Sequence, residues 1–217
     1  ASSQTLESRF NTINQAIYEG RFAEAIKDLN ALMSIKEAEL PAKALLALAA
    51  AMSDDRELAV QALAEFKDPK SITKVEVLLA IGSAYFKLGD AFNAIRFLDA
   101  AVKLNPNHPL VVARLGACLV GIGRIKDALP HLQKGVELMP ESGGAWLNLA
   151  RAHLELNDVD AALVALNQSE PFPDKEVSLF TLVKSEVLSR SGKSEEAEAL
   201  LKSAVEAGQE GIIPELI

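Results

Sequence analysis

The residues of this chain whose types most often carry chemistry are three histidines and one cysteine. His108, His131 and His153 form neither a His-x-x-His nor a His-Glu-x-x-His pair, the spacings that place two imidazoles on one helical face around a metal ion. Cys118 is the single cysteine, and no histidine stands at a spacing typical of a catalytic pair, so we interpret it as a small buried hydrophobe. The sequence therefore predicts no metal site, no cofactor and no enzymatic activity.

Two further patterns resemble functional motifs but have simpler explanations. The run from Gly116 to Gly123 is rich in glycine, yet no Lys-Ser/Thr pair follows at the spacing of a phosphate loop and no strand precedes it. Glu195, Glu196 and Glu198 form an acidic run. We interpret this run as the solvated first turn of a helix, where negative charge interacts favourably with the helix dipole.

Composition limits the class of partner. The 217 residues carry a formal net charge of −8, and the basic residues are dispersed, so nucleic-acid binding is not expected. The longest apolar run, residues 44–52, is shorter than the ~18–20 residues that cross a bilayer, so no membrane insertion is expected. One cysteine and the lack of a signal peptide favour a cytoplasmic location. The chain has no initiator Met, which leaves a removed targeting segment open.

A repeat runs through the whole sequence, and its structural units must position any functional side chains. An Ala-x-x-x-Leu pair recurs with spacings of 34 or 35 residues. Its members are Ala25/Leu29, Ala59/Leu63, Ala94/Leu98, Ala128/Leu132, Ala162/Leu166 and Ala197/Leu201. Five residues before each Ala stands a turn-forming residue: Gly20, Asp54, Gly89, Gly123, Asn157 and Gly192. Twelve residues before it stands a small residue in five of the six periods, namely Ala47, Gly82, Gly116, Ala150 and Ser185, with Ile13 the exception.

Each period is interpreted as two helices. In the third period, apolar residues at offsets of three and four predict a first helix over about 75–88. Gly89 and Asp90 end that helix and cap a second one, which runs to about Leu104. Gly82 is predicted to face Ala94 and to allow close approach of the two backbones. Pro130 is predicted to make its helix begin late or bend.

This pattern resembles the tetratricopeptide repeat family. The match rests on Trp146, Leu149, Ala150 and Ala162 in one period and on residues from Leu78 to Pro106 in another. The resemblance implies an all-α fold, a right-handed superhelical solenoid of about six stacked helix–turn–helix repeats. We place the repeats at 6–39, 40–73, 75–108, 109–142, 143–176 and 178–211, in a single array over 1–217 that ends in an apolar tail at 212–217. Whether this tail is the cut end of a longer chain is left open.

The resemblance also implies that the first helix of each repeat lines a concave groove. The residues predicted to bind a partner there are Asn11, Asn14, Tyr18, Leu48, Met52, Ser83, Phe86, Lys87, Arg114, Asn148 and Arg151. Apolar anchors with a few polar residues are typical of surfaces that bind a helix or peptide. The alternative for Leu45, Leu79 and Ile17 is packing between neighbouring helices, and Arg114 and Arg151 have the alternative of pairing with nearby glutamates.

Three functions are open at this point. The first is a non-catalytic protein–protein interaction scaffold that binds a peptide or helical segment of a partner. The second is an N-terminal docking or regulatory region of a larger enzyme, of transferase or oxygenase type. The third is a self-associating assembly factor, a homo-oligomer formed through the terminal repeat and its tail, including Ile212, Ile213 and Leu216.

Overall fold

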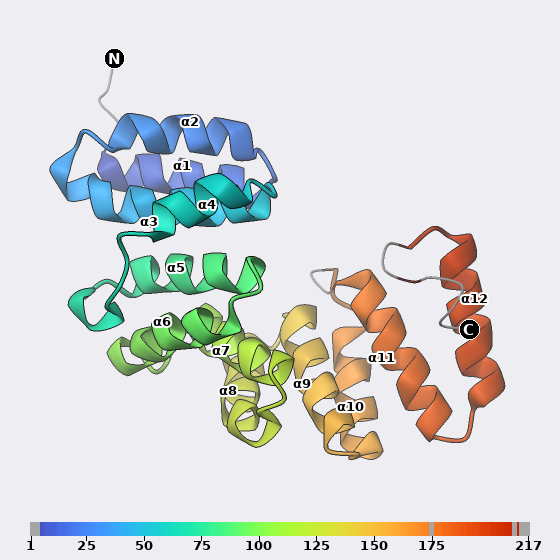
Figure 1. The fold of residues 1–217 in the computed structure, drawn as a ribbon. Coiled ribbons are helices and arrows are strands. Elements are labelled where there is room, and N and C mark those ends of the chain that lie inside the picture. Colours follow the sequence, from blue (N-terminus) through green and yellow to red (C-terminus); the bar gives the residue numbers. More distant parts are fainter. Residues whose placement is uncertain (1–4, 174–175, 210–211, 213–217) are drawn as a thin grey trace. The chain divides into compact units, whose positions relative to one another are not determined.

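The computed structural model describes residues 5–173, 176–209 and 212. Within them the chain is helical and has no strand. The helices are α1 Leu6–Tyr18, α2 Phe22–Leu32, α3 Lys36–Met52, α4 Arg56–Leu63, α5 Val75–Lys87, α6 Ala91–Leu104, α7 Pro109–Gly121, α8 Ile125–Leu138, α9 Gly143–Glu155, α10 Val159–Ser169, α11 Val177–Arg190 and α12 Ser194–Glu206, with a short 3-10 helix at Pro69–Ser71. The all-α helix–turn–helix fold class is confirmed (Figure 1).

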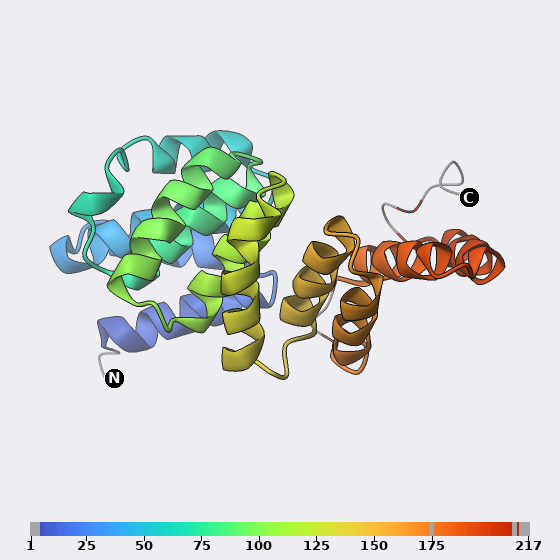
Figure 2. The same cartoon turned by 90° about the horizontal axis from the view of Figure 1, so that it is seen from below.

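The chain divides into two compact units, residues 1–114 and 115–217. In the first unit α1 packs on α2, α3 on α4 and α5 on α6, and α3 also packs directly on α5. In the second unit α9 pairs with α10 and α11 with α12, as both Figures 1 and 2 show, and α11 contacts α9 and α10. The predicted single array over 1–217 stays a prediction, and residues 213–217 of the predicted tail lie outside the described residues.

The six predicted turn residues all adopt the left-handed backbone conformation. Their φ angles lie between 60° and 81°. At each turn the N–H of the following residue donates to a carbonyl five residues earlier, as Asp90 N does to Tyr85 O at 2.9 Å. This hydrogen bond satisfies a carbonyl that the helix end leaves open. Four of the positions are glycine, and Asp54 and Asn157 are of the two other residue types that tolerate this conformation best.

The Ala-x-x-x-Leu pairs form the core of every helix pair. All twelve side chains are at most 9% exposed. A Cβ atom added to Gly82 would lie 2.7 Å from Leu98 Cγ and 3.3 Å from the Ala94 carbonyl oxygen. The expected close approach is therefore present, but the side chain that fills the space over Gly82 is Leu98 and not Ala94. A Cβ atom added to Gly116 would likewise lie too close to the Leu132 side chain, at 2.7 Å from its Cδ2 atom.

Two helix boundaries differ from the sequence predictions. Helix α3 begins at Lys36, ahead of the predicted repeat boundary at 40, and includes Pro41. Helix α8 begins at Ile125 and includes Pro130, so the predicted late start of that helix is wrong. Both prolines are the sixth residue of their helix, where a proline removes a single backbone hydrogen bond. Packing of the apolar face on both sides of the proline keeps each helix continuous.

Candidate partner-binding surface

The predicted binding residues all belong to the first helices of the helix pairs. Asn11, Asn14 and Tyr18 are on α1; Leu48 and Met52 are on α3; Ser83, Phe86 and Lys87 are on α5; Arg114 is on α7; Asn148 and Arg151 are on α9. The first nine residues lie in the first unit and the last two in the second.

Helix α1 presents a polar face with one large aromatic side chain. Asn11 and Asn14 are exposed, and Tyr18 is 84% exposed. A tyrosine this open has apolar surface that none of the described residues covers, and it also has a hydroxyl that can donate to a partner. It is the most accessible of the predicted anchors.

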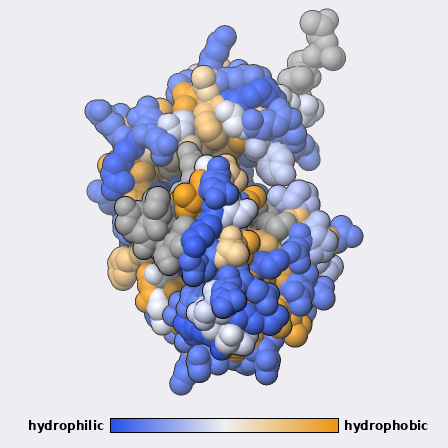
Figure 3. Space-filling view, turned by 90° about the vertical axis from the view of Figure 1, so that its right-hand side faces the viewer, coloured by the Kyte–Doolittle hydropathy of each residue, from blue (hydrophilic) through white to orange (hydrophobic). Residues whose placement is uncertain are grey.

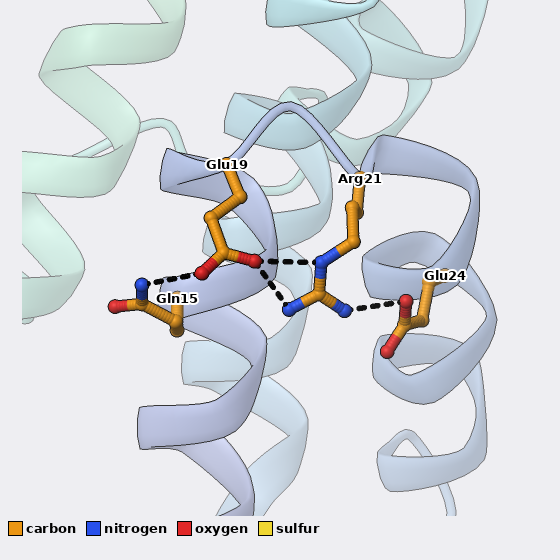
Figure 4. Close-up of polar contacts among 4 residues, drawn as sticks. All are labelled: Gln15, Glu19, Arg21 and Glu24. Atoms are coloured by element: carbon orange, nitrogen blue, oxygen red, sulfur yellow. Dashed lines mark hydrogen bonds and ion pairs between the residues drawn. The ribbon is translucent and has the colours of Figure 1, made fainter.

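A chain of polar contacts stabilises the end of α1 beside Tyr18 (Figure 4). Gln15 Nε2 donates to Glu19 Oε1 at 2.6 Å, and the Arg21 guanidinium bonds both Glu19 and Glu24. The hydrogen bonds from Gln15 and Arg21 lower the pKa of Glu19, and those to Glu24 and Glu19 raise the pKa of Arg21. These groups are exposed, so solvent screens their interaction. Their effect is local: they hold the turn between α1 and α2.

On α3 and α5 the predicted residues divide into accessible and buried ones. Leu48, Met52 and Phe86 are half-buried and Lys87 is exposed. Ser83 is only 5% exposed. The prediction that Ser83 belongs to an accessible surface is therefore corrected, because this small side chain is buried among the packed helices.

The alternative reading of the neighbouring leucines as packing residues agrees with the structure. Leu45 and Leu79 are partly buried, and both pack against the core that α3, α5 and α6 share. Leu48 contacts the same core, while Met52 packs against the core of α1, α2 and α3. These half-buried side chains can contribute to packing and to a partner surface at once.

The structure brings two predicted residues from different helices together. The Arg114 guanidinium carbon lies 5.6 Å from the centroid of the Phe86 ring, within the range of a cation–π interaction. Phe86 is on α5, and Arg114, the last residue of the first unit, is on the part of α7 that belongs to that unit, so the contact lies within the first unit. It places a cationic group directly beside an accessible aromatic ring. We call Asn11, Asn14, Tyr18, Leu48, Met52, Phe86, Lys87 and Arg114 the first-helix surface.

In the second unit the two predicted residues are half-buried on α9. Asn148 Nδ2 donates to the Gly144 carbonyl oxygen at 3.0 Å, one turn earlier in its own helix. Arg151 forms no ion pair with any residue that the structure describes. The pairing of Arg151 with a glutamate, weighed from the sequence, is therefore not seen in the described part of the chain.

A small cavity of about 250 Å³ lies elsewhere in the first unit and was missed from the sequence. It is lined by Arg56, Val60, Leu63, Ala64, Tyr85, Leu88 and Asp90, none of which was predicted to bind. Tyr85 stacks on Phe97 with centroids 5.6 Å apart, and burial together with the nearby Asp90 carboxylate raises the pKa of Tyr85. Helix α4, with eight residues, is the shortest of the described α-helices, and no pattern in the sequence signals the space beside it.

Other features of the described residues bear on function class. They include no group of three or more His, Cys, Asp or Glu side chains placed to hold a metal ion. No helix among them is both long enough and apolar enough to cross a membrane. Hydrophilic side chains cover most of the face seen in Figure 3, where hydrophobic side chains form small separate patches.

Two tetratricopeptide repeat family models match the chain, one over residues 123–182 and one over residues 75–108. The Hsp70-Hsp90 organizing protein of Triticum aestivum is 34% identical over 86 residues, which are 40% of this chain and 15% of that protein. The anaphase-promoting complex subunit CDC16 of Saccharomyces cerevisiae is 30% identical over 108 residues, 50% of this chain and 12% of that protein. The aligned part of this chain thus spans less than a sixth of the length of either relative.

Among solved structures, that of pilF from Pseudomonas aeruginosa superposes with a TM-score of 0.67. The superposition covers 91% of this chain and 89% of the other, and the sequences are 16% identical. At this identity the similarity concerns the fold alone.

Proposed function

Because the chain is a tetratricopeptide repeat protein, we propose that it is a non-catalytic scaffold whose first-helix surface binds a peptide or helical segment of a partner protein. The observation that supports this function best is the accessibility of Tyr18, Met52 and Phe86 on three first helices of one unit. Recognition of an amphipathic segment needs apolar anchors of this kind, with polar groups that fix its orientation. Asn11, Asn14, Lys87 and Arg114 supply the polar groups.

The experiment compares two triple variants in the first unit. In the test variant Tyr18, Met52 and Phe86 are changed to Ala; in the control variant Val60, Phe92 and Leu104, which are exposed apolar residues outside the first-helix surface, are changed to Ala. Peptides are first selected from a displayed library on the wild-type chain, and their affinities for all three proteins are then measured by fluorescence anisotropy.

We expect the test variant to bind the selected peptides at least ~10-fold more weakly, because loss of anchor residues typically costs more than 1 kcal/mol each. The control variant should stay within about twofold of the wild type, and circular dichroism should show equal helicity in all three. Equal weakening in both variants, or none in the test variant, would contradict the proposal.

The two alternative functions remain predictions. A docking role within a larger enzyme is compatible with the small share of each relative that the chain spans. Self-association through the terminal repeat depends partly on Ile213 and Leu216, which lie outside the described residues. The cytoplasmic location also stays a prediction.

A further inference from the structure

The cavity of about 250 Å³ in the first unit combines an aliphatic lining with two groups of opposite charge. The aliphatic lining comes from Val60, Leu63, Ala64 and Leu88. Arg56, at the start of α4, and Asp90, just before α6, supply the charges. An apolar cavity of about 150 Å³ takes up benzene, so this cavity has room for a ligand of roughly ten non-hydrogen atoms.

Hydrogen bonds orient both charged groups without using all of their capacity. Arg56 Nη1 donates to the Leu88 carbonyl oxygen at 3.2 Å. The Asp90 carboxylate accepts from Asn93, at Oδ1 from the backbone N–H at 3.0 Å and at Oδ2 from Nδ2 at 2.7 Å. A guanidinium has further N–H donors and a carboxylate has further lone pairs. Within the described part of the chain neither group forms an ion pair, so the cavity presents a cation and an anion that are not paired with one another.

Tyr85 adds a hydroxyl to the same cavity. Its ring stacks on Phe97 with centroids 5.6 Å apart, and this contact fixes the plane of the ring. Burial, together with the nearby Asp90 carboxylate, raises the pKa of Tyr85. The hydroxyl therefore stays protonated, and it can donate to an anionic group or accept from a cationic one.

We infer that this cavity binds a free α-amino acid with an aliphatic side chain, whose ammonium group bonds Asp90 and whose carboxylate bonds Arg56. A ligand with one charge is attracted by one of these residues and repelled by the other, whereas a zwitterion is attracted by both. A side chain of leucine size fits the remaining space and covers the aliphatic lining, which removes apolar surface from water. A residue inside a peptide chain offers only neutral groups, so the two full charges favour the free amino acid.

The site shares no residue with the first-helix surface and does not depend on the function proposed for it. All of the residues that line it lie between Arg56 and Asp90, within the first unit.

The probe is L-leucine at millimolar concentrations, titrated into the full chain and followed by NMR chemical shifts of backbone amides. Three analogues control for its parts. Isocaproate lacks the amino group, isopentylamine lacks the carboxylate, and N-acetyl-leucinamide is a neutral mimic of leucine within a peptide. We expect L-leucine to shift amides of α4 and of the turn between α5 and α6, and we expect each analogue to bind at least ~10-fold more weakly, because a charged hydrogen bond contributes about 1.5–3 kcal/mol.

The variants remove one charge at a time. Asp90→Asn keeps the cap of α6, because asparagine caps a helix as well as aspartate does. Arg56→Gln removes the guanidinium. Asp158→Asn is the matched control, since Asp158 caps α10 in the same way and lies in the second unit. The two cavity variants should bind L-leucine at least ~10-fold more weakly than the wild type, and the control should stay within about twofold.

Four results would overturn the inference. They are the absence of leucine-dependent shifts in the wild type, an analogue that binds as tightly as leucine, unchanged leucine affinity in Asp90→Asn or Arg56→Gln, and equal weakening in Asp158→Asn. Tight binding of N-acetyl-leucinamide would mean that the cavity takes a side chain of a partner protein instead of a free amino acid.

A further variant tests the cavity without changing a charge. Ala64→Leu places a larger side chain in the lining, at an exposed position where little packing is disturbed. It should weaken leucine binding at least ~10-fold at equal helicity by circular dichroism, because the added side chain occupies the space of the ligand. The same affinity as in the wild type would overturn the inference.

Discussion

The α5–α6 pair of the first unit and the α11–α12 pair of the second have the same motif but different surroundings. Helix α5 buries seven residues, including Leu78 and Gly82. Helix α11 buries four, and at the corresponding positions it has Thr181 and Ser185. The turn and the Ala-x-x-x-Leu pair are sufficient to form the hairpin in both cases. The depth of burial depends instead on how many neighbouring helices cover the hairpin.

The polar residues of α11 agree with this difference. A buried hydroxyl costs free energy unless it is hydrogen-bonded. The Thr181 hydroxyl has two acceptors within reach, the Val177 carbonyl oxygen and Gln209 Oε1, each at 3.0 Å, and the Ser185 hydroxyl donates to the Leu182 carbonyl oxygen at 2.9 Å. Two of the four buried side chains of α11 are therefore hydroxyl-bearing, whereas α5 buries one, Ser83, beside five apolar side chains and Gly82.

The largest expected effect tests the burial difference directly. Leu98→Ala should destabilise the first unit by about 3–5 kcal/mol, because a fully buried leucine leaves a cavity when truncated. Leu201→Ala, at a position 9% exposed, should cost about 2–3 kcal/mol in the second unit, where the site can collapse more easily. Urea unfolding followed by hydrogen exchange of amides in α6 and α12 measures both. Equal costs would show that the two pairs are equally packed.

The next effect concerns the small residue that stands twelve positions before the repeat alanine, which is Gly82 in α5 and Ser185 in α11. Gly82→Ala should destabilise by about 1–2 kcal/mol, because the clash of the new Cβ with Leu98 Cγ outweighs the gain in helix propensity. Ser185→Ala at the same position of α11 should be within ~0.5 kcal/mol of neutral, since no such clash is created and only a local hydrogen bond is lost.

A double variant shows whether Leu98 is the cause. In the Leu98→Ala background, Gly82→Ala should no longer destabilise, because the contacting side chain is gone. Urea denaturation of the wild type, the two single variants and the double variant gives the four free energies of unfolding that this comparison requires. A cost that persists in the double variant would place the strain in the backbone of α5.

A smaller change in stability is expected at the two turns whose left-handed residue is not glycine. Asp54→Gly in the first unit and Asn157→Gly in the second should each stabilise by about 0.5–1 kcal/mol, because glycine adopts a positive φ without steric cost. Gly89→Ala should destabilise by about 1 kcal/mol for the same reason. Thermal unfolding of the three variants measures these changes, and a loss of stability in Asn157→Gly would mean that its side chain stabilises the turn.

The smallest effect is the pH dependence of the exposed contacts at the α1–α2 turn. The pKa of Glu19 is lowered from its ordinary value of 4.5. Its contribution to stability is therefore fully present above about pH 4.5 and is lost as the pH falls through the lower pKa of the folded state. NMR titration of the Glu19 carboxyl should show the lowered pKa, and Arg21→Gln should move it back towards 4.5. An unchanged pKa in Arg21→Gln would assign the shift to Gln15 alone.

Much of the fold could be predicted from local sequence, because its signals are local. A residue that adopts the left-handed conformation determines where a helix ends. An alanine and a leucine at fixed offsets from it determine which face of the next helix is buried. The six turns and twelve core positions were therefore predictable. The sequence also singled out Tyr18, Phe86 and Arg114, because the register of the repeat assigns them to the first helices.

Tertiary structure decided the features that depend on neighbours distant in the sequence. Ser83 is buried by packing that its position in the repeat did not reveal, and α3 continues through Pro41. The contact between Phe86 and Arg114 joins residues whose spacing carries no periodic signal. The same is true of Ile212, which packs in one cluster with Leu201 and Ala204. Burial and side-chain contacts are properties of the assembled helices, so only the folded chain determines them.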